Sequence, residues 1–120
     1  MEYKETFIVK GKYGIHVGPN CKIAMLVLDK RMEFFDENKN LEVTITRNYC
    51  SNPLSKIESA DASHAGELLS LGMTEGSELE VIAKLDPKDS NQKYKKELKE
   101  LVRGIGNIIR NIDKFTIRQH

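Results

Sequence analysis

The nine residues YGIHVGPNC, at positions 13–21, mark the change from a predicted strand to a predicted helix near the start of this 120-residue chain. Gly14 and Gly18 flank His16, and glycine at such positions is typical of turns. Pro19 suits the first turn of a helix, where its missing N–H costs nothing. The stretch therefore predicts a loop that presents one imidazole at a helix start. His16 is then either an ordinary turn residue or a group placed to meet a phosphoryl group.

Four segments around this loop have the residue pattern of strands. The clearest is 41–47, in which Leu41, Val43 and Ile45 alternate with polar residues. Segment 78–85 alternates in the same way, and segment 3–10 places Phe7 and Val9 on one face. A weaker short strand is predicted over Ser55–Ala60.

Two of three predicted helices precede residue 73. A helix over 19–32 carries two adjoining apolar stripes, which predict a wide buried face. The first stripe holds Ile23, Leu26, Val27 and Lys30, and the second holds Cys21, Ala24, Met25 and Leu28. We therefore expect Cys21 to be a small buried hydrophobic residue rather than a nucleophile. A short helix follows within 62–72, with its end marked by Gly72.

The third predicted helix is long and runs from Tyr94 to Ile112 with apolar residues at helical spacing. Gly104 and Gly106 interrupt this pattern, each at a cost of about 1 kcal/mol relative to alanine. They predict a kink or an early end. The full order is strand, helix, strand, strand, short helix, strand, long helix. This order favours an α+β fold, an open-faced β-sandwich with a four-stranded antiparallel sheet and three helices on one face.

The composition is that of one globular domain over residues 1–120, with 39% hydrophobic and 31% charged residues. The formal net charge of +1 gives no argument for a nucleic-acid partner. The longest apolar run, 23–28, is too short to span a bilayer, and the acidic N-terminus has no apolar signal core. We therefore expect a cytoplasmic protein. Cys21 and Cys50 are too few and too unpatterned for a disulfide framework or a zinc site, so no metal site is expected.

The element order and the histidine loop together resemble HPr, the histidine-containing phosphocarrier protein of the bacterial sugar phosphotransferase system. That family has a β-α-β-β-α-β-α sandwich with its active histidine in a pattern close to Gly-[Leu/Ile]-His-x-Arg-Pro. The corresponding run here is Gly14-Ile15-His16-Val17-Gly18-Pro19. Ser70-Leu71-Gly72 and the strand ELEVIA resemble the end of the family's second helix and its fourth strand. The resemblance covers roughly 3–103, which leaves a C-terminal helical extension over about 104–120.

The resemblance implies a phosphocarrier that accepts a phosphoryl group on His16 from enzyme I and passes it to an enzyme IIA-type protein. The backbone near Val17, Gly18 and Asn20 would form the phosphate cradle, because a helix start offers free N–H groups and partial positive charge. The family's arginine is replaced by Gly18, which removes a charged hydrogen bond worth about 1.5–3 kcal/mol. Lys12 or Lys22 is the candidate replacement, as a point charge without the bidentate fork.

The region of the family's regulatory serine matches less well. Ser63 fits that position, as the target of a regulatory kinase, if one residue is inserted before Ser70-Leu71-Gly72. An ungapped placement puts His64 there instead. The alternative reading of Ser63 is an N-cap or turn hydroxyl before the short helix, and His64 is expected to be an exposed residue at the helix terminus.

Two other functions compete with the carrier. The first is a diverged HPr-like regulatory or protein-binding module without phosphotransfer, which Gly18 in place of the arginine favours. The second is an unrelated open-faced sandwich that uses its sheet for binding. A different strand order would support that last reading and contradict the other two.

Overall fold

The sheet brings together strands that lie far apart in the sequence. The computed structural model describes residues 1–11, 17–49, 58–86 and 91–115. Its strands pair antiparallel in the order β1-β4-β2-β3. Their bounds are Glu2–Ile8 for β1, Asn40–Tyr49 for β2, Ser59–Asp61 for β3 and Glu78–Asp86 for β4. The predicted strand at Ser55–Ala60 thus corresponds to β3, although residues 55–57 lie outside the described part of the chain.

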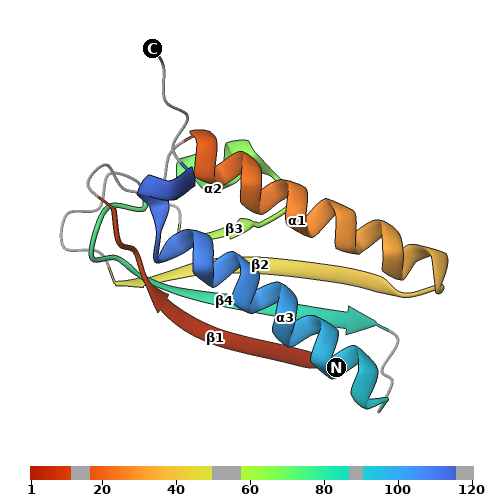
Figure 1. Cartoon of the computed structure of the whole chain (residues 1–120). Helices are drawn as coiled ribbons and strands as arrows, with labels where there is room; N and C mark the ends of the chain where they lie inside the picture. Colours follow the sequence, from red (N-terminus) through yellow and green to blue (C-terminus); the bar gives the residue numbers. More distant parts are fainter. Residues whose placement is uncertain (12–16, 50–57, 87–90, 116–120) are drawn as a thin grey trace.

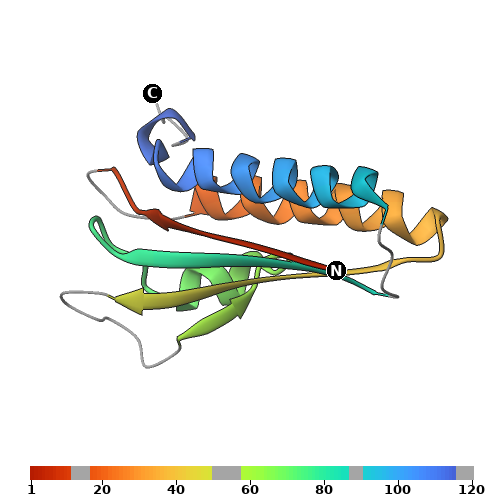
Figure 2. The ribbon, with the colours of Figure 1, turned by 90° about the horizontal axis from the view of Figure 1, so that it is seen from below.

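Helices cover one side of this sheet. They are α1 (Val17–Asp36), α2 (Ala65–Ser70) and α3 (Gln92–Ile109), followed by a 3-10 turn η1 (Ile112–Phe115). Figure 1 shows α1 and α3 lying alongside each other across the strands, with α2 beside the start of α1. Figure 2 shows the sheet as one layer below α1 and α3, with its other face uncovered. The predicted open-faced α+β sandwich is confirmed.

The alternate apolar residues of the strands are buried in the core, as predicted. Leu41, Val43 and Ile45 of β2 are at most 1% exposed, and the alternate residues of β4 are at most 2% exposed. Phe7 and Val9 are buried, while Ile8 between them is 41% exposed. One face of the sheet is therefore apolar, which is what the helices need in order to bury their own apolar sides.

Helix α1 is longer than predicted, and its buried face is narrower than the predicted one. The residues that face the core include Ile23, Ala24, Val27 and Phe34, whereas Cys21, Met25 and Leu28 are exposed. The predictions of a wide buried face and of a buried Cys21 were therefore wrong. The sheet and α3 cover one side of α1, and α2, with six residues, is too short to cover the neighbouring stripe of a 20-residue helix.

Helix α3 runs through both of its glycines, so the predicted kink or early end was also wrong. A Cβ on Gly106 would lie 2.1 Å from Cε1 of Phe7, which shows that glycine lets α3 approach β1 closely. Beyond α3, the backbone of Lys10 accepts from Ile112 N and donates to Ile109 O, both at 3.1 Å. These bonds hold the C-terminal residues against the segment that leads from β1 to the histidine loop.

Candidate functional site

The start of α1 carries the backbone part of the expected site. Val17 is the first residue of the helix and follows His16 directly in the chain. Val17, Gly18 and Asn20 lie in the first turn, where backbone N–H groups have no acceptor within the helix. Pro19, between them, has no N–H to leave unpaired. His16 and Lys12 lie outside the described residues, so the imidazole and one candidate charge partner remain predictions from the sequence.

Asn20 has an unusual environment in this first turn. Its side chain is 1% exposed, and neither its amide nitrogen nor its oxygen has a hydrogen-bond partner among the described residues. A buried polar group left in this state costs about 1–3 kcal/mol. Sequence reasoning assigned this residue a backbone role, and its side chain adds an unpaired donor and acceptor at the same helix start.

An apolar groove lies between the start of α1 and α2, and we call it the α1–α2 groove. It has a volume of about 180 Å³. Val17 and Leu69 are 58% and 50% exposed, so the rim of the groove is apolar as well as its walls. The residues that line it are Val17, Asn20, Cys21, Ala65, Gly66 and Leu69.

Lys22 is the one of the two predicted charge partners that lies within the described residues. Lys22 is exposed in the second turn of α1, beyond the first-turn N–H groups. Gly18 itself contributes no cation. The described part of the site therefore consists of backbone donors, the Asn20 amide and the neighbouring apolar groove.

The start of α2 is capped by His64. Its Nδ1 accepts a hydrogen bond from the backbone N–H of Glu67 at 3.2 Å, and its side chain is exposed, as predicted for a residue at a helix terminus. Ser63 precedes the cap and is held in a turn. Its backbone N–H and its hydroxyl both donate to Asp61 Oδ1, at 2.9 and 2.7 Å. The structure thus gives Ser63 the role of a turn hydroxyl, and its regulatory role stays a prediction.

Arg31 of α1 also contacts this turn before α2. Its Nη1 donates to Ser63 Oγ at 2.9 Å, and its Nη2 lies 3.7 Å from Asp61 Oδ1. Burial raises the pKa of Asp61, but the bonds from Ser63 and the charge of Arg31 outweigh this, and the pKa lies below its ordinary value. The Asp-x-Ser spacing before a helix could have indicated the turn. Nothing in the sequence pointed to Arg31, which is distant in the chain.

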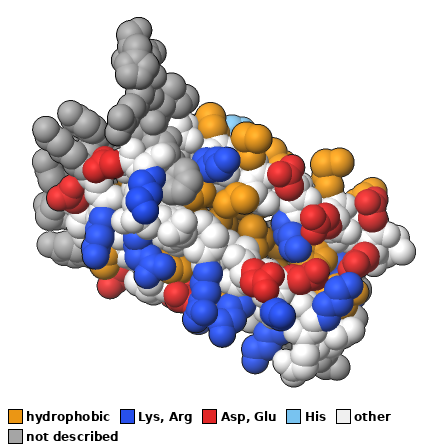
Figure 3. Space-filling view, viewed as in Figure 1, with side chains coloured by type: hydrophobic (Ala, Val, Ile, Leu, Met, Phe, Trp, Pro, Cys, Tyr) orange, Lys and Arg blue, Asp and Glu red, His pale blue; other side chains and the backbone are white. Residues whose placement is uncertain are grey.

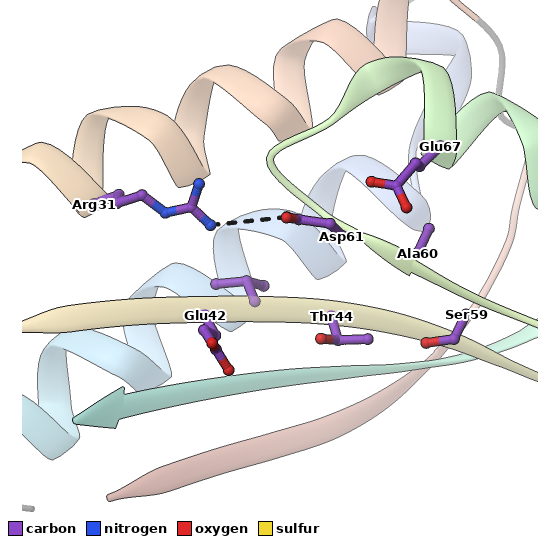
Figure 4. A pocket seen from close by; sticks show the side chains of 8 residues that line it. Arg31, Glu42, Thr44, Ser59, Ala60, Asp61 and Glu67 are labelled. Atoms are coloured by element: carbon purple, nitrogen blue, oxygen red, sulfur yellow. Dashed lines mark ion pairs between the residues drawn. The ribbon is translucent and has the colours of Figure 1, made fainter. Parts of the chain in front are cut away.

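Arg31 and Asp61 border a polar pocket of about 320 Å³ (Figure 4). In Figure 4, Arg31 extends from α1 toward Asp61, and Glu67 comes from α2. Arg31 Nε also donates to the carbonyl of Leu41 at 3.2 Å. The guanidinium therefore connects α1 to β2 and to the turn before α2. Arg31 thus has a structural role in this pocket.

Within residues 1–11, 17–49, 58–86 and 91–115, His, Cys, Asp and Glu side chains nowhere gather in a group of three or more that could hold a metal ion. In the same ranges, each helix is too short or too polar to cross a bilayer.

Comparison with known proteins identifies the fold through structure alone. The sequence matches neither a protein-family model nor a curated protein. The phosphocarrier protein HPr from Bacillus anthracis superposes with a TM-score of 0.61 at 11% identity, covering 91% of this chain and 98% of that one. A histidine-containing phosphocarrier protein of Mycoplasma gives a TM-score of 0.59 at 14% identity, covering 98% and 100%. HPr from Thermoanaerobacter tengcongensis gives 0.54 at 15% identity, covering 88% and 96%.

Proposed function

We propose that this chain, which has the HPr fold, is a phosphocarrier of a phosphoenolpyruvate-dependent phosphotransferase system in the bacterial cytoplasm. In this proposal residues 1–120 act as one domain. His16 accepts a phosphoryl group on Nδ1 from an enzyme I-type donor and passes it to an enzyme IIA-type acceptor. The observation that carries the proposal is the position of α1, which begins at Val17, directly after His16, in a chain with this fold.

The helix start has the chemistry that such a histidine needs. Partial positive charge at a helix N-terminus disfavours the imidazolium and so keeps the imidazole neutral, which is the nucleophilic form. The N–H groups of Val17, Gly18 and Asn20 would then donate to the phosphoryl oxygens. The unpaired amide of Asn20 offers a further donor in the same turn.

The remaining roles are assigned by the same reasoning. Lys12 or Lys22 would supply the positive charge that Gly18 lacks, and no resident cofactor or metal takes part. The α1–α2 groove, which adjoins the helix start, would be part of the surface on which the donor and acceptor proteins dock. Phosphorylation of Ser63 by a regulatory kinase would place a dianion beside Asp61 and Arg31 and would disturb the turn before α2.

A second candidate function is a regulatory or protein-binding module that uses the same face without phosphotransfer. Two observations favour it. Gly18 replaces the family's arginine, and His64, not Ser63, caps α2. The module would retain the groove and the helix start for docking, with no phosphoryl group on His16.

One experiment separates the two functions. The protein is incubated with phosphoenolpyruvate, magnesium and an enzyme I from the same organism, and its intact mass is measured beside His16→Ala and an ordinary HPr in the same tube. A single acid-labile phosphoryl adduct that is absent from His16→Ala supports the carrier. An unmodified protein beside a fully labelled HPr rejects the carrier and leaves the binding module.

A further inference from the structure

A second apolar stripe runs along the exposed side of α1, and we call it the α1 seam. It consists of Cys21, Met25, Leu28, Met32 and Phe35. Cys21 is exposed, and the exposed fractions of the others are 58%, 44%, 70% and 74%. Figure 3 shows hydrophobic side chains gathered over the position of α1. An apolar strip of this length on a surface helix marks an interaction site.

The spacing of the seam indicates the kind of partner. Its residues alternate steps of four and three, the a/d pattern by which one helix packs against another in a coiled coil. A helix whose apolar residues face one core does not need this second, strictly periodic stripe. The expected partner is therefore a helix of matching length and period.

We propose that the partner is α1 of a second copy of this chain, packed antiparallel to form a symmetric dimer, with Phe35 of each copy seated in the α1–α2 groove of the other. The seam is nearly symmetric about Leu28: Cys21 and Phe35 each lie seven positions, or roughly 10 Å, away from it along the helix, and Met25 and Met32 lie three and four positions away. A two-fold axis near Leu28 thus places Cys21 opposite Phe35 and brings Met25 close to Met32 of the other copy.

The α1–α2 groove lies where the antiparallel dimer requires a cavity for Phe35 of the second copy. Cys21 and Val17 form part of its wall, at the level that Phe35 of the second copy would reach. Its volume of about 180 Å³ is enough for a phenyl ring, since an apolar cavity of about 150 Å³ holds benzene. Phe35 is 74% exposed, so the dimer would bury the most exposed large apolar side chain of the described chain.

Charges next to the seam are largely complementary in the antiparallel dimer. Lys22, Asp29 and Asp36 lie along one flank of it at heptad spacing. In the antiparallel dimer, Lys22 faces Asp36 of the other copy at both ends, and the axis brings the two Asp29 residues together. The two Lys22–Asp36 pairs of opposite charge outnumber the single Asp29–Asp29 contact at the axis.

The dimer covers the α1–α2 groove and the exposed side of Val17. A partner that docks on this face would therefore compete with self-association. The dimer itself does not depend on phosphotransfer at His16, so the two proposals can fail separately.

The association is measured by sedimentation equilibrium over a concentration series. Met32→Glu and Phe35→Glu each place a charge in the seam, and each is expected to weaken the dimer by about 100-fold or more. The matched control is Ile8→Glu, which alters an apolar side chain that is 41% exposed on the open face of the sheet and should leave the dimer unchanged. A wild-type protein that is monomeric throughout, or a dimer that both seam variants leave intact, overturns the proposal. Circular dichroism confirms that each variant is folded.

Orientation is tested by disulfide cross-linking in a Cys50→Ser background. With Phe35→Cys added, the antiparallel dimer should form a bond between Cys21 of one copy and position 35 of the other, identified by peptide mass mapping. Without that substitution the two Cys21 residues would lie roughly 20 Å apart along the helices and should not cross-link. An efficient Cys21–Cys21 bond would instead indicate parallel helices and would overturn the antiparallel arrangement.

Discussion

The ring of Phe7 in β1 lies directly against Gly106 in α3, so that a Cβ at position 106 would fall 2.1 Å from Cε1 and 2.2 Å from Cζ of the ring. The same ring lies under the guanidinium of Arg110, 5.4 Å from its centroid. Gly104, two positions earlier, has its nearest neighbour, Leu26 Cδ1, at 3.9 Å from the equivalent point. The two glycines that looked alike in the sequence therefore have different roles.

Gly106→Ala should lower the free energy of unfolding by about 1–3 kcal/mol, because the added methyl group overpacks the contact between α3 and β1. Gly104→Ala is the matched control. It should raise the free energy of unfolding by up to about 1 kcal/mol, through helix propensity alone. Urea unfolding of both variants checks this. If both substitutions changed the free energy of unfolding equally and in the same direction, the contact with Phe7 would not be the reason for glycine at position 106.

His64→Ala should lower the free energy of unfolding by about 1 kcal/mol, because the backbone N–H of Glu67 loses the side-chain acceptor that caps α2. His64→Asn keeps an acceptor of a preferred capping type and should be at least as stable as the wild type. Thermal unfolding of the pair tests the cap. If His64→Ala were as stable as the wild type, water would satisfy the backbone N–H of Glu67 equally well.

Asp61→Asn should be less stable than the wild type at neutral pH by about 0.5–1.5 kcal/mol, and the difference should close in acid. The pKa of Asp61 is lowered in the folded protein, so its contribution is present above the unfolded pKa and is lost as the pH falls through the folded pKa. Urea unfolding at pH 7 and over a series of pH values below the ordinary aspartate pKa of about 3.9 follows this loss. Glu75→Gln, on an exposed turn, is the control, and a gap for Asp61→Asn that persists in acid would contradict the assignment.

Gly18→Arg should speed phosphorylation of His16 if the carrier function is correct. Restoring a charged hydrogen bond of about 1.5–3 kcal/mol corresponds to roughly 10- to 100-fold in rate or in phosphoryl affinity. Gly18→Ala is the control, since it changes helix propensity without adding charge. Mass spectrometry of timed reactions with enzyme I gives the rates. Equal rates for the arginine and alanine variants would show that a side chain at position 18 does not contact the phosphoryl group.

The strands and the fold could be predicted from the sequence because period-two alternation records burial directly. Leu41, Val43 and Ile45 are apolar because the sheet has one covered face. The two apolar stripes of α1 were different, since periodicity shows that a face is apolar but not what covers it. Cys21 and Met25 were predicted to be buried for that reason.

The features that the sequence missed depend on residues that meet through the fold. The need for glycine at 106 arises from Phe7, at the other end of the chain. The turn before α2 depends on Arg31, whose two polar contacts there involve Asp61 and Ser63. For the candidate site, the Gly-Ile-His run and Pro19 located the helix start, but the unpaired side chain of Asn20 emerged only from its burial.

The pairing of β1 also determines when folding can be completed during synthesis. β1 is the first strand to leave the ribosome, yet it pairs with residues 78–84 of β4 and packs against α3 near position 106. The next segment of chain, at Lys10, bonds to Ile109 and Ile112. β1 thus has no partner strand until β4 has been made, and Phe7 lacks its contact with α3 until nearly all of the described chain has been translated. A nascent chain stalled before residue 78 would therefore display β1 as an unpaired strand, the form most prone to aggregate or to recruit a chaperone.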